Sequence, residues 1–354
     1  MTAAVYGQSS LEIFFIGVFM PMLDWSALVS QVTEQTLVLN QWYRSRLMND
    51  GDVLPPNNEV QYLVAFDGEL NAAVLTQLHA FLNEQHITDC QVCLYQPLSE
   101  LKPALAIAFS PENPIVRERF ELLQTEVSLQ LALFSTPPTL SQPGLLVMDM
   151  DSTAIEIECI DEIARLAGVY DEVSQVTAQA MQGALEFSES LRLRVAKLEG
   201  VEQVLIDQLK AQLPLMHGVQ SLCSVLKQHN WKLAIASGGF IPFAQQVQSL
   251  LELDAIHANE LESKDGALTG RVLGTIVDAE EKRNFLLRYA DQLGLSLSQT
   301  VAMGDGANDL KMMHCAGLGV AVHGKPLVAK MADVAVQHGS LLQVIYFLAL
   351  PPLA

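Results

Sequence analysis

Four short apolar runs mark the second half of the chain and constrain its fold more than any other feature. They are LLVMDM (145–150), KLAIAS (232–237), TVAMGD (300–305) and LGVAV (318–322). Unbroken apolar runs of this length are typical of parallel strands that helices cover on both faces. Helical patterns separate the runs, so we predict an α/β fold with a doubly wound parallel sheet. Ligands bind such sheets at the carboxyl ends of the strands, and the residues that end each run are therefore the candidate site.

A proline-rich segment, TPPTLSQPG (136–144), precedes the first apolar run and has the composition of a linker. We therefore predict an N-terminal domain at 1–135 and a second domain at 145–345. The N-terminal part has the patterns of a small α+β module, with strands at 61–66, 89–95 and 104–109 and helices at 69–84 and 116–134. An apolar stretch at 11–23 is shorter than the ~20 residues of a membrane span and contains Glu12, so we expect no span there.

The chain between the first two apolar runs is much longer than a crossover connection needs. Its sequence, 151–231, has helical patterns throughout, whereas the loops of α/β units are short. We predict that the surplus forms an inserted helical cap, at about 155–225, over the strand ends.

The first apolar run ends in DMDST, which places two acids, Asp149 and Asp151, at alternate positions of an extended segment. Their side chains project to the same side, and paired acids suit a nucleophile with an acid/base, or a metal bridge. Such a pair is also common in loops and helix caps. Its place directly after a buried strand favours the chemical interpretation.

Three further motifs follow in the same strand context. Ser237 and Gly238, after the second run, offer a hydroxyl and a backbone that an oxyanion can approach closely. Lys282 is a cation near an acidic helix start, where a solvated surface lysine is the ordinary interpretation. The third run opens into GDGANDLKMM, whose oxygen-bearing side chains suit a hard cation, although a turn motif looks the same; they are Asp305, Asn308 and Asp309.

Taken together and in this order, the four motifs resemble those of the haloacid dehalogenase superfamily of phosphatases, over roughly residues 144–345. The resemblance implies that Asp149 becomes phosphorylated and that Asp151 is the general acid/base. It also implies that Ser237 and Gly238 bind phosphate while Lys282 stabilises its charge.

The resemblance further implies a Mg²⁺ cofactor. Its expected ligands are the carboxylates of Asp149 and Asp305 and the backbone carbonyl of Asp151. Asn308 and Asp309 support this site, and Asn308 is also expected at the substrate.

Two segments, DMDSTAIEIECIDEIARLAG and FSESLRLRV, are similar to the bacterial phosphoserine phosphatases of this superfamily. The similarity places Glu158 at the substrate's ammonium group and Arg194 at its carboxylate, with Met181 and Phe187 as apolar contacts. It implies hydrolysis of O-phospho-L-serine to L-serine and phosphate, the last step of serine biosynthesis. The ordinary alternatives are a helical charge pattern for Glu158 and a surface ion pair for Arg194.

An ACT-like module often precedes the phosphatase in this family, and the N-terminal pattern is compatible with one. Regulation, formation of a homodimer and a contribution to stability all stay open for it.

Charge and cysteine content restrict the partners and the location. The formal net charge of −20 disfavours nucleic acid and anionic membranes. A phosphate site in such a chain must therefore carry local positive charge, a metal or oriented N–H groups. The five cysteines show no disulfide framework, so we expect a reducing compartment, the cytoplasm.

Other functions stay open at the level of sequence, among them a phosphatase that acts on another small phosphate ester. A phosphotransferase would pass the phosphoryl group from Asp149 to an alcohol such as homoserine, and product analysis with acceptor alcohols separates it from a hydrolase. A sensing protein with a vestigial phosphatase domain would show no turnover, although the intact acids and Lys282 argue against it.

Overall fold

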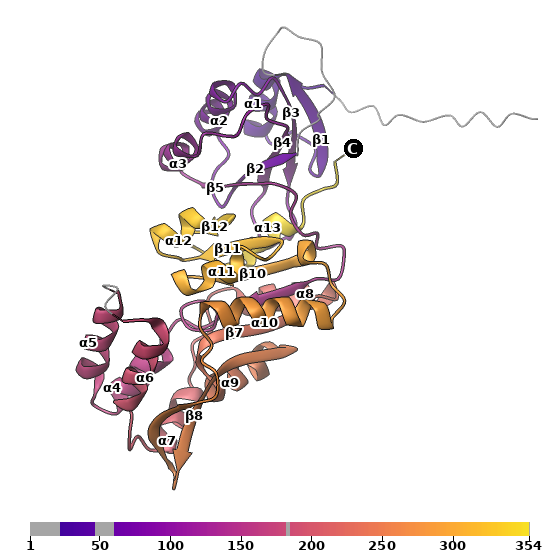
Figure 1. Ribbon diagram of the computed structural model, residues 1–354. Coiled ribbons are helices and arrows are strands. Elements are labelled where there is room, and N and C mark those ends of the chain that lie inside the picture. Colours follow the sequence, from indigo (N-terminus) through magenta and orange to yellow (C-terminus); the bar gives the residue numbers. More distant parts are fainter. Residues whose placement is uncertain (1–21, 47–59, 182–184, 354) are drawn as a thin grey trace, which may run out of the picture.

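The computed structural model describes residues 22–46, 60–181 and 185–353, which form two β-sheets with their helices (Figure 1). The predicted apolar stretch at 11–23 lies outside the described residues except for its last two positions. In the described part of the chain, no helix is both long enough and apolar enough to cross a membrane.

The larger sheet has seven strands in the order β12-β11-β10-β6-β7-β8-β9. All neighbours are parallel except β8 and β9, which form an antiparallel pair at one edge. The fold is therefore α/β with a mostly parallel sheet, as predicted. Its strands are β6 (Leu145–Met148), β7 (Lys232–Phe240), β8 (Ala255–Lys264), β9 (Ala267–Leu273), β10 (Thr300–Gly304), β11 (Leu318–Val322) and β12 (Val334–Val336).

Helices cover both faces of this sheet, which explains why its central strands are apolar without alternation. Leu145 and Val147 of β6 pack in one core layer with Leu286, and Leu146 and Met148 pack in another with Phe243. The first layer lies under α10 (Ala279–Gln292), α11 (Leu310–Met313) and α12 (Pro326–Met331), and η2 (Ala307–Asp309) directly precedes α11. The second lies under α8 (Val219–Gln228), α9 (Ile241–Leu251), η3 (Leu341–Val344) and α13 (Ile345–Leu348).

The chain between β6 and α8 leaves the sheet to form a separate group of helices. They are α4 (Cys159–Leu166), α5 (Tyr170–Met181), α6 (Phe187–Ala196) and α7 (Gln203–Lys210). Figure 1 shows α4, α5 and α6 together at one side of the seven-stranded sheet. The two connections pair with each other: the N–H of Met216 donates to the carbonyl of Ala154 at 2.9 Å, and Ile155 bridges Leu215. The group also meets the edge of the sheet, where the Gly200 N–H donates to the carbonyl of Leu268 in β9 at 2.8 Å and Glu202 bridges Ala267.

The smaller sheet has five antiparallel strands in the order β1-β3-β4-β2-β5. The strands are β1 (Gln41–Arg46), β2 (Gln61–Phe66), β3 (Asp89–Tyr95), β4 (Ala104–Phe109) and β5 (Gln130–Phe134). One face packs against α1 (Trp25–Thr33), α2 (Ala72–Glu84) and α3 (Arg117–Glu126).

One predicted helix in this part is wrong in its second half. The helix expected at 116–134 ends at Glu126, and Val127 already has extended backbone angles. The following apolar segment, Gln130–Phe134, pairs with β2 instead. Its apolar residues suit a buried helix and a buried strand equally, and the open edge of β2 decides between them by supplying backbone hydrogen bonds.

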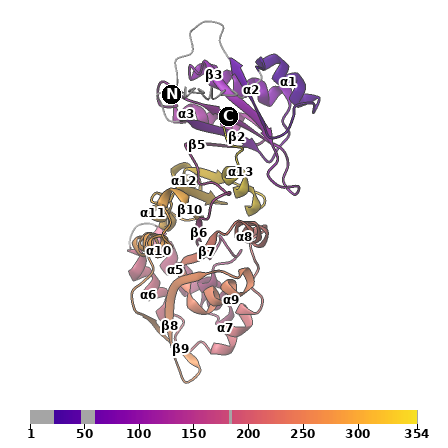
Figure 2. The same cartoon turned by 90° about the vertical axis from the view of Figure 1, so that its right-hand side faces the viewer.

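The second face of the five-stranded sheet packs against the C-terminal segment of the chain. The Tyr95 hydroxyl donates to the carbonyl of Tyr346 at 2.8 Å, and the Tyr346 hydroxyl donates to the carbonyl of Lys102 at 2.6 Å. Phe66 meets Phe347 edge to face, with ring centroids 5.3 Å apart. The two sheets thus share one hydrophobic core, and the smaller sheet lies far from the α4–α6 group (Figures 1 and 2).

Candidate active site

The site is built around the residue that follows the central strand. β6 is fully buried between β10 and β7, and Asp149 comes directly after it with only 5% of its surface exposed. The Asp149 N–H donates to the carbonyl of Met303 at 2.9 Å, which extends the pairing with β10 by one residue. The Asp149 carboxylate is therefore fixed at the carboxyl edge of the sheet.

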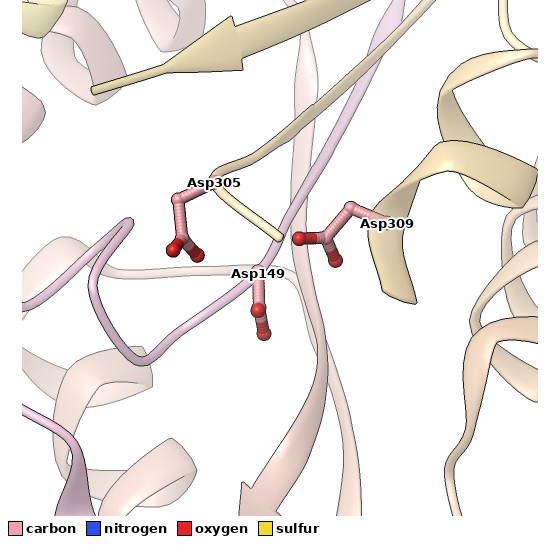
Figure 3. Close-up of side chains that lie close together, drawn as sticks. All are labelled: Asp149, Asp305 and Asp309. Carbon is pink, nitrogen blue, oxygen red and sulfur yellow. The ribbon is translucent and has the colours of Figure 1, made fainter. Parts of the chain in front are cut away.

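Three carboxylates meet at this edge, and Figure 3 shows Asp305 and Asp309 on either side of Asp149. One oxygen from each lies within 4.8 Å of the others. Burial raises the pKa of Asp305 to about 6, and the Asp149 carboxylate adds to the effect. Mutual repulsion of this kind is relieved by a cation, and carboxylate oxygens suit a hard divalent ion. The donor set therefore fits a divalent metal. The side chain of Asp151 lies outside this cluster, so the expectation for that residue rests on its backbone carbonyl alone.

Lys282 supplies a fixed positive charge in contact with two of these carboxylates. Its side chain is fully buried, and its Nζ lies 2.9 Å from Asp149 Oδ1 and 2.7 Å from Asp309 Oδ1. Burial by itself lowers the pKa of this lysine, but the two carboxylates outweigh burial and raise the pKa. The surface interpretation of Lys282 is thereby excluded.

Asp309 holds Lys282 rather than standing free. Its second oxygen, Oδ2, accepts the N–H of Gly306 at 3.0 Å, so both oxygens have partners. This geometry requires a glycine at position 304, because a Cβ there would lie 2.3 Å from the Asp309 carboxyl carbon. Asn308 is half-buried beside it, close to Gly306.

The end of β7 forms a second wall. Ser237 is buried, and its Oγ accepts the N–H of Gly239 at 2.9 Å. A Cβ at Gly238 would lie 2.8 Å from Cζ of Phe187, so the first residue of α6 touches this strand end. The structure therefore places Phe187 in contact with Gly238.

One residue of this wall was not predicted from the sequence. Asn259 of β8 is buried and donates from Nδ2 to the carbonyl of Gly238 at 2.8 Å. Its Oδ1 accepts the N–H of Val277 at 2.9 Å, just before the helix that carries Lys282. It therefore fixes Gly238 relative to Lys282. An asparagine within a strand has no motif around it, so the sequence carries no signal for this role.

Asp151 lies beside Asp149 and is set up to hold a proton. Burial, followed by the Glu158 and Asp149 carboxylates, raises its pKa well above the ordinary value, while hydrogen bonds from Cys159 oppose the shift. Among the described residues, its Oδ1 is buried without a hydrogen-bond partner. A protonated carboxyl with an unused oxygen suits a general acid.

The α4–α6 group contributes one carboxylate and one cation. Glu158 precedes α4 and accepts a hydrogen bond from the Ser152 hydroxyl at 2.8 Å. Desolvation raises the pKa of Glu158, and the Ser152 hydrogen bond opposes this shift. Burial lowers the pKa of Arg194, and the carboxylates of Asp161 and Glu158 oppose this shift.

Arg194 has unused hydrogen-bonding capacity. Within the described part of the chain it forms no ion pair, and its buried Nε has no hydrogen-bond partner. The surface-pair interpretation therefore does not fit. Met181 ends α5, but its side chain lies outside the described residues.

The haloacid dehalogenase-like hydrolase family matches residues 144–317. A phosphoserine phosphatase from Vibrio cholerae serotype O1 is 48% identical over 229 residues, which are 65% of this chain and 70% of the relative.

Two solved structures show the same similarity. A crystal structure of a probable phosphoserine phosphatase from Vibrio cholerae, in unliganded form, has a TM-score of 0.66 and 41% identity, covering 82% of this chain and 87% of its own. A phospho-aspartyl intermediate analogue of a phosphoserine phosphatase has a TM-score of 0.56 and 36% identity, covering 58% of this chain and 99% of its own.

Proposed function

The chain belongs to the phosphoserine phosphatases of the haloacid dehalogenase-like hydrolases, and we propose that Asp149 carries the phosphoryl group while the enzyme converts O-phospho-L-serine to L-serine and phosphate. The observation that carries the proposal is the buried contact of 2.9 Å between Lys282 Nζ and Asp149 Oδ1 at the end of the central strand. A carboxylate held there by a fixed cation is oriented for attack and has charge compensation beside it.

The reaction divides into two displacements at phosphorus. In the first, an Asp149 oxygen forms a bond to phosphorus while the bond from phosphorus to the serine oxygen breaks, and Asp151 gives its proton to that oxygen. In the second, Asp151 takes a proton from water, whose oxygen attacks phosphorus and releases Asp149. The raised pKa of Asp151 supports the first role, because the carboxyl keeps its proton until the leaving oxygen needs it.

The remaining residues of the two walls bind and neutralise the phosphoryl group. Ser237 and Gly238 offer a hydroxyl and backbone at the end of β7, and Lys282 provides the fixed positive charge. We propose Mg²⁺ as the metal, held by Asp149, Asp305 and the Asp151 carbonyl, with Asn308 and Asp309 supporting the site. When bound, the ion neutralises phosphoryl charge as a Lewis acid.

The α4–α6 group provides substrate recognition in this proposal. Glu158 binds the ammonium group of phosphoserine, and Arg194 binds its carboxylate with the donors that the protein leaves unused. Phe187 gives an apolar contact against Gly238. The same role for Met181 stays a prediction.

A charge-to-alanine change at Arg194 tests the substrate assignment. Arg194→Ala should lower kcat/KM for phosphoserine. The loss should correspond to roughly 2–5 kcal/mol of activation free energy, the cost of removing one partner of a buried charge pair. Phosphoethanolamine, which lacks the carboxylate, should be hydrolysed almost as before. Arg192→Ala is the matched control, since Arg192 is exposed on the same helix. A ratio of the two kcat/KM values that stays constant in Arg194→Ala would remove Arg194 from carboxylate recognition.

Three further proposals concern the whole chain. We propose that residues 145–345 form the phosphatase domain, with a cap inserted at about 155–225, and that 136–144 link it to an ACT-like domain at 1–135. A homodimer is testable by light scattering. A cytoplasmic location is consistent with the cysteines, which are all free.

A further inference from the structure

Ser152 occupies a backbone conformation that few serines adopt. Its φ is 55°, in the left-handed region, where a residue with a Cβ is held only by its surroundings. The Ser152 N–H donates to the carbonyl of Ile157 at 3.3 Å, which closes the loop between Asp151 and α4. This turn directs the Ser152 hydroxyl to Glu158 Oε1, to which it donates at 2.8 Å.

Glu158 needs such a donor because its other charged neighbours are mostly acids. Desolvation raises the pKa of Glu158, and the carboxylates of Asp149 and Asp161 add to this effect. Arg194 opposes it only as the weakest of the contributions, without forming an ion pair in the described residues. The Ser152 hydroxyl is thus the side chain that holds the Glu158 carboxylate, and it does so at one oxygen only.

We propose that Ser152 is a positioning residue for substrate specificity: it orients the Glu158 carboxylate so that the second oxygen receives the substrate's ammonium group. The inference rests on the proposed function, in which Glu158 binds that group. A hydroxyl that donates to one oxygen of a carboxylate fixes its rotamer and favours the ionised state, and both strengthen a contact with a cation.

The position of Ser152 ties recognition to catalysis. Ser152 directly follows Asp151, and the next residue, Thr153, donates from Oγ1 towards Asp305 Oδ1 at 3.5 Å. One loop therefore carries the proton donor, a contact to the carboxylate cluster and the support of Glu158.

Three substrates separate this role from a general structural one. Phosphoserine and phosphoethanolamine carry the amino group, whereas 3-phosphooxypropanoate lacks it and keeps the carboxylate. Ser152→Ala should lower kcat/KM for the two amines by roughly tenfold, the scale of a hydrogen bond to a charged group. The loss should reside mainly in KM, because the ammonium contact is made in both the bound substrate and the transition state. The value for 3-phosphooxypropanoate should change by less than about twofold.

Two further variants serve as controls. Ser99→Ala removes the same kind of bond, since the Ser99 hydroxyl donates to Glu100 at 2.9 Å on the smaller sheet's domain, and it should leave all three substrates unchanged. Ser152→Gly removes the hydroxyl but relaxes the left-handed backbone. It should reproduce the selectivity change of Ser152→Ala even if its thermal stability differs.

The outcomes distinguish the inference from its premise. If wild-type protein hydrolyses phosphoserine no better than 3-phosphooxypropanoate, the proposed function fails at the ammonium site. If wild type prefers the amines and Ser152→Ala loses all three substrates equally, Ser152 only shapes the loop and the positioning role is refuted. An unchanged preference in Ser152→Ala and Ser152→Gly refutes it as well.

Discussion

Removal of the buried lysine charge is the perturbation whose magnitude the structure defines best. Lys282→Met keeps most of the side-chain volume but leaves Asp149 and Asp309 without the cation at 2.9 and 2.7 Å. At an effective dielectric constant of about 20, a pair of unit charges at this distance interacts by about 6 kcal/mol. Part of this is recovered when a carboxylate takes up a proton, so we expect a loss of about 3–5 kcal/mol in the free energy of unfolding, the usual cost of breaking a buried pair.

The loss should depend on pH in a defined direction. Burial raises the pKa of Asp309 while Lys282 opposes the shift, so removing Lys282 raises the folded-state pKa further above the unfolded value. A carboxyl with a raised folded-state pKa binds more protons when folded, and its protein gains stability as the pH falls. The deficit of Lys282→Met relative to wild type should therefore be smaller at about pH 5.5 than at about pH 7.5.

The assay is chemical denaturation in excess chelator, with the phosphate-release rate measured in parallel with Mg²⁺. Lys232→Met is the control. Lys232 Nζ lies 2.6 Å from the carboxylate of Asp254, but the Lys232 side chain is 48% exposed. This exposed ion pair should contribute little to the free energy of unfolding. Activity of Lys282→Met should fall by roughly a hundredfold or more, as when one charge-stabilising donor is removed. A deficit equal to that of Lys232→Met, or one that grows as the pH falls, would refute the electrostatic argument.

Asp149→Asn should lower kcat by roughly a thousandfold or more while substrate still binds, because an amide is a poor nucleophile. If the variant retains a tenth of wild-type kcat, Asp149 is not the nucleophile. Activity should require Mg²⁺, and Ca²⁺ should be a poor substitute because it is larger and takes more oxygen ligands. Mg²⁺ should also raise the melting temperature. Full activity in excess chelator would contradict the expected metal dependence. Gly304→Ala should destabilise the protein by about 1–3 kcal/mol, since its Cβ would collide with the Asp309 carboxyl, and denaturation would measure this; an unchanged midpoint would contradict the close approach.

Local chemistry determined the parts of this protein that the sequence could predict. The apolar runs at 145–150, 232–237, 300–305 and 318–322 correspond to β6, β7, β10 and β11, because a strand covered on both faces leaves an uninterrupted apolar signal. The polar residues after these runs lie together, since parallel strands present their carboxyl ends at one edge of a sheet. Asp149, Asp305 and Lys282 could therefore be named from strand endings and motif order.

Tertiary structure alone decided the features that depend on a distant partner. Gln130–Phe134 became a strand because β2 offered an open edge, which no local pattern records. The β8–β9 pair, α1 and β1 were not predicted, and Asn259 became part of the site only because the fold places Gly238 and Val277 on either side of it. The raised pKa of Asp151 likewise depends on burial and on the acids brought near it. The sequence thus determined which groups stand at the strand ends, whereas their partners and charges follow from long-range packing, because electrostatic and hydrogen-bond energies depend on distance in space.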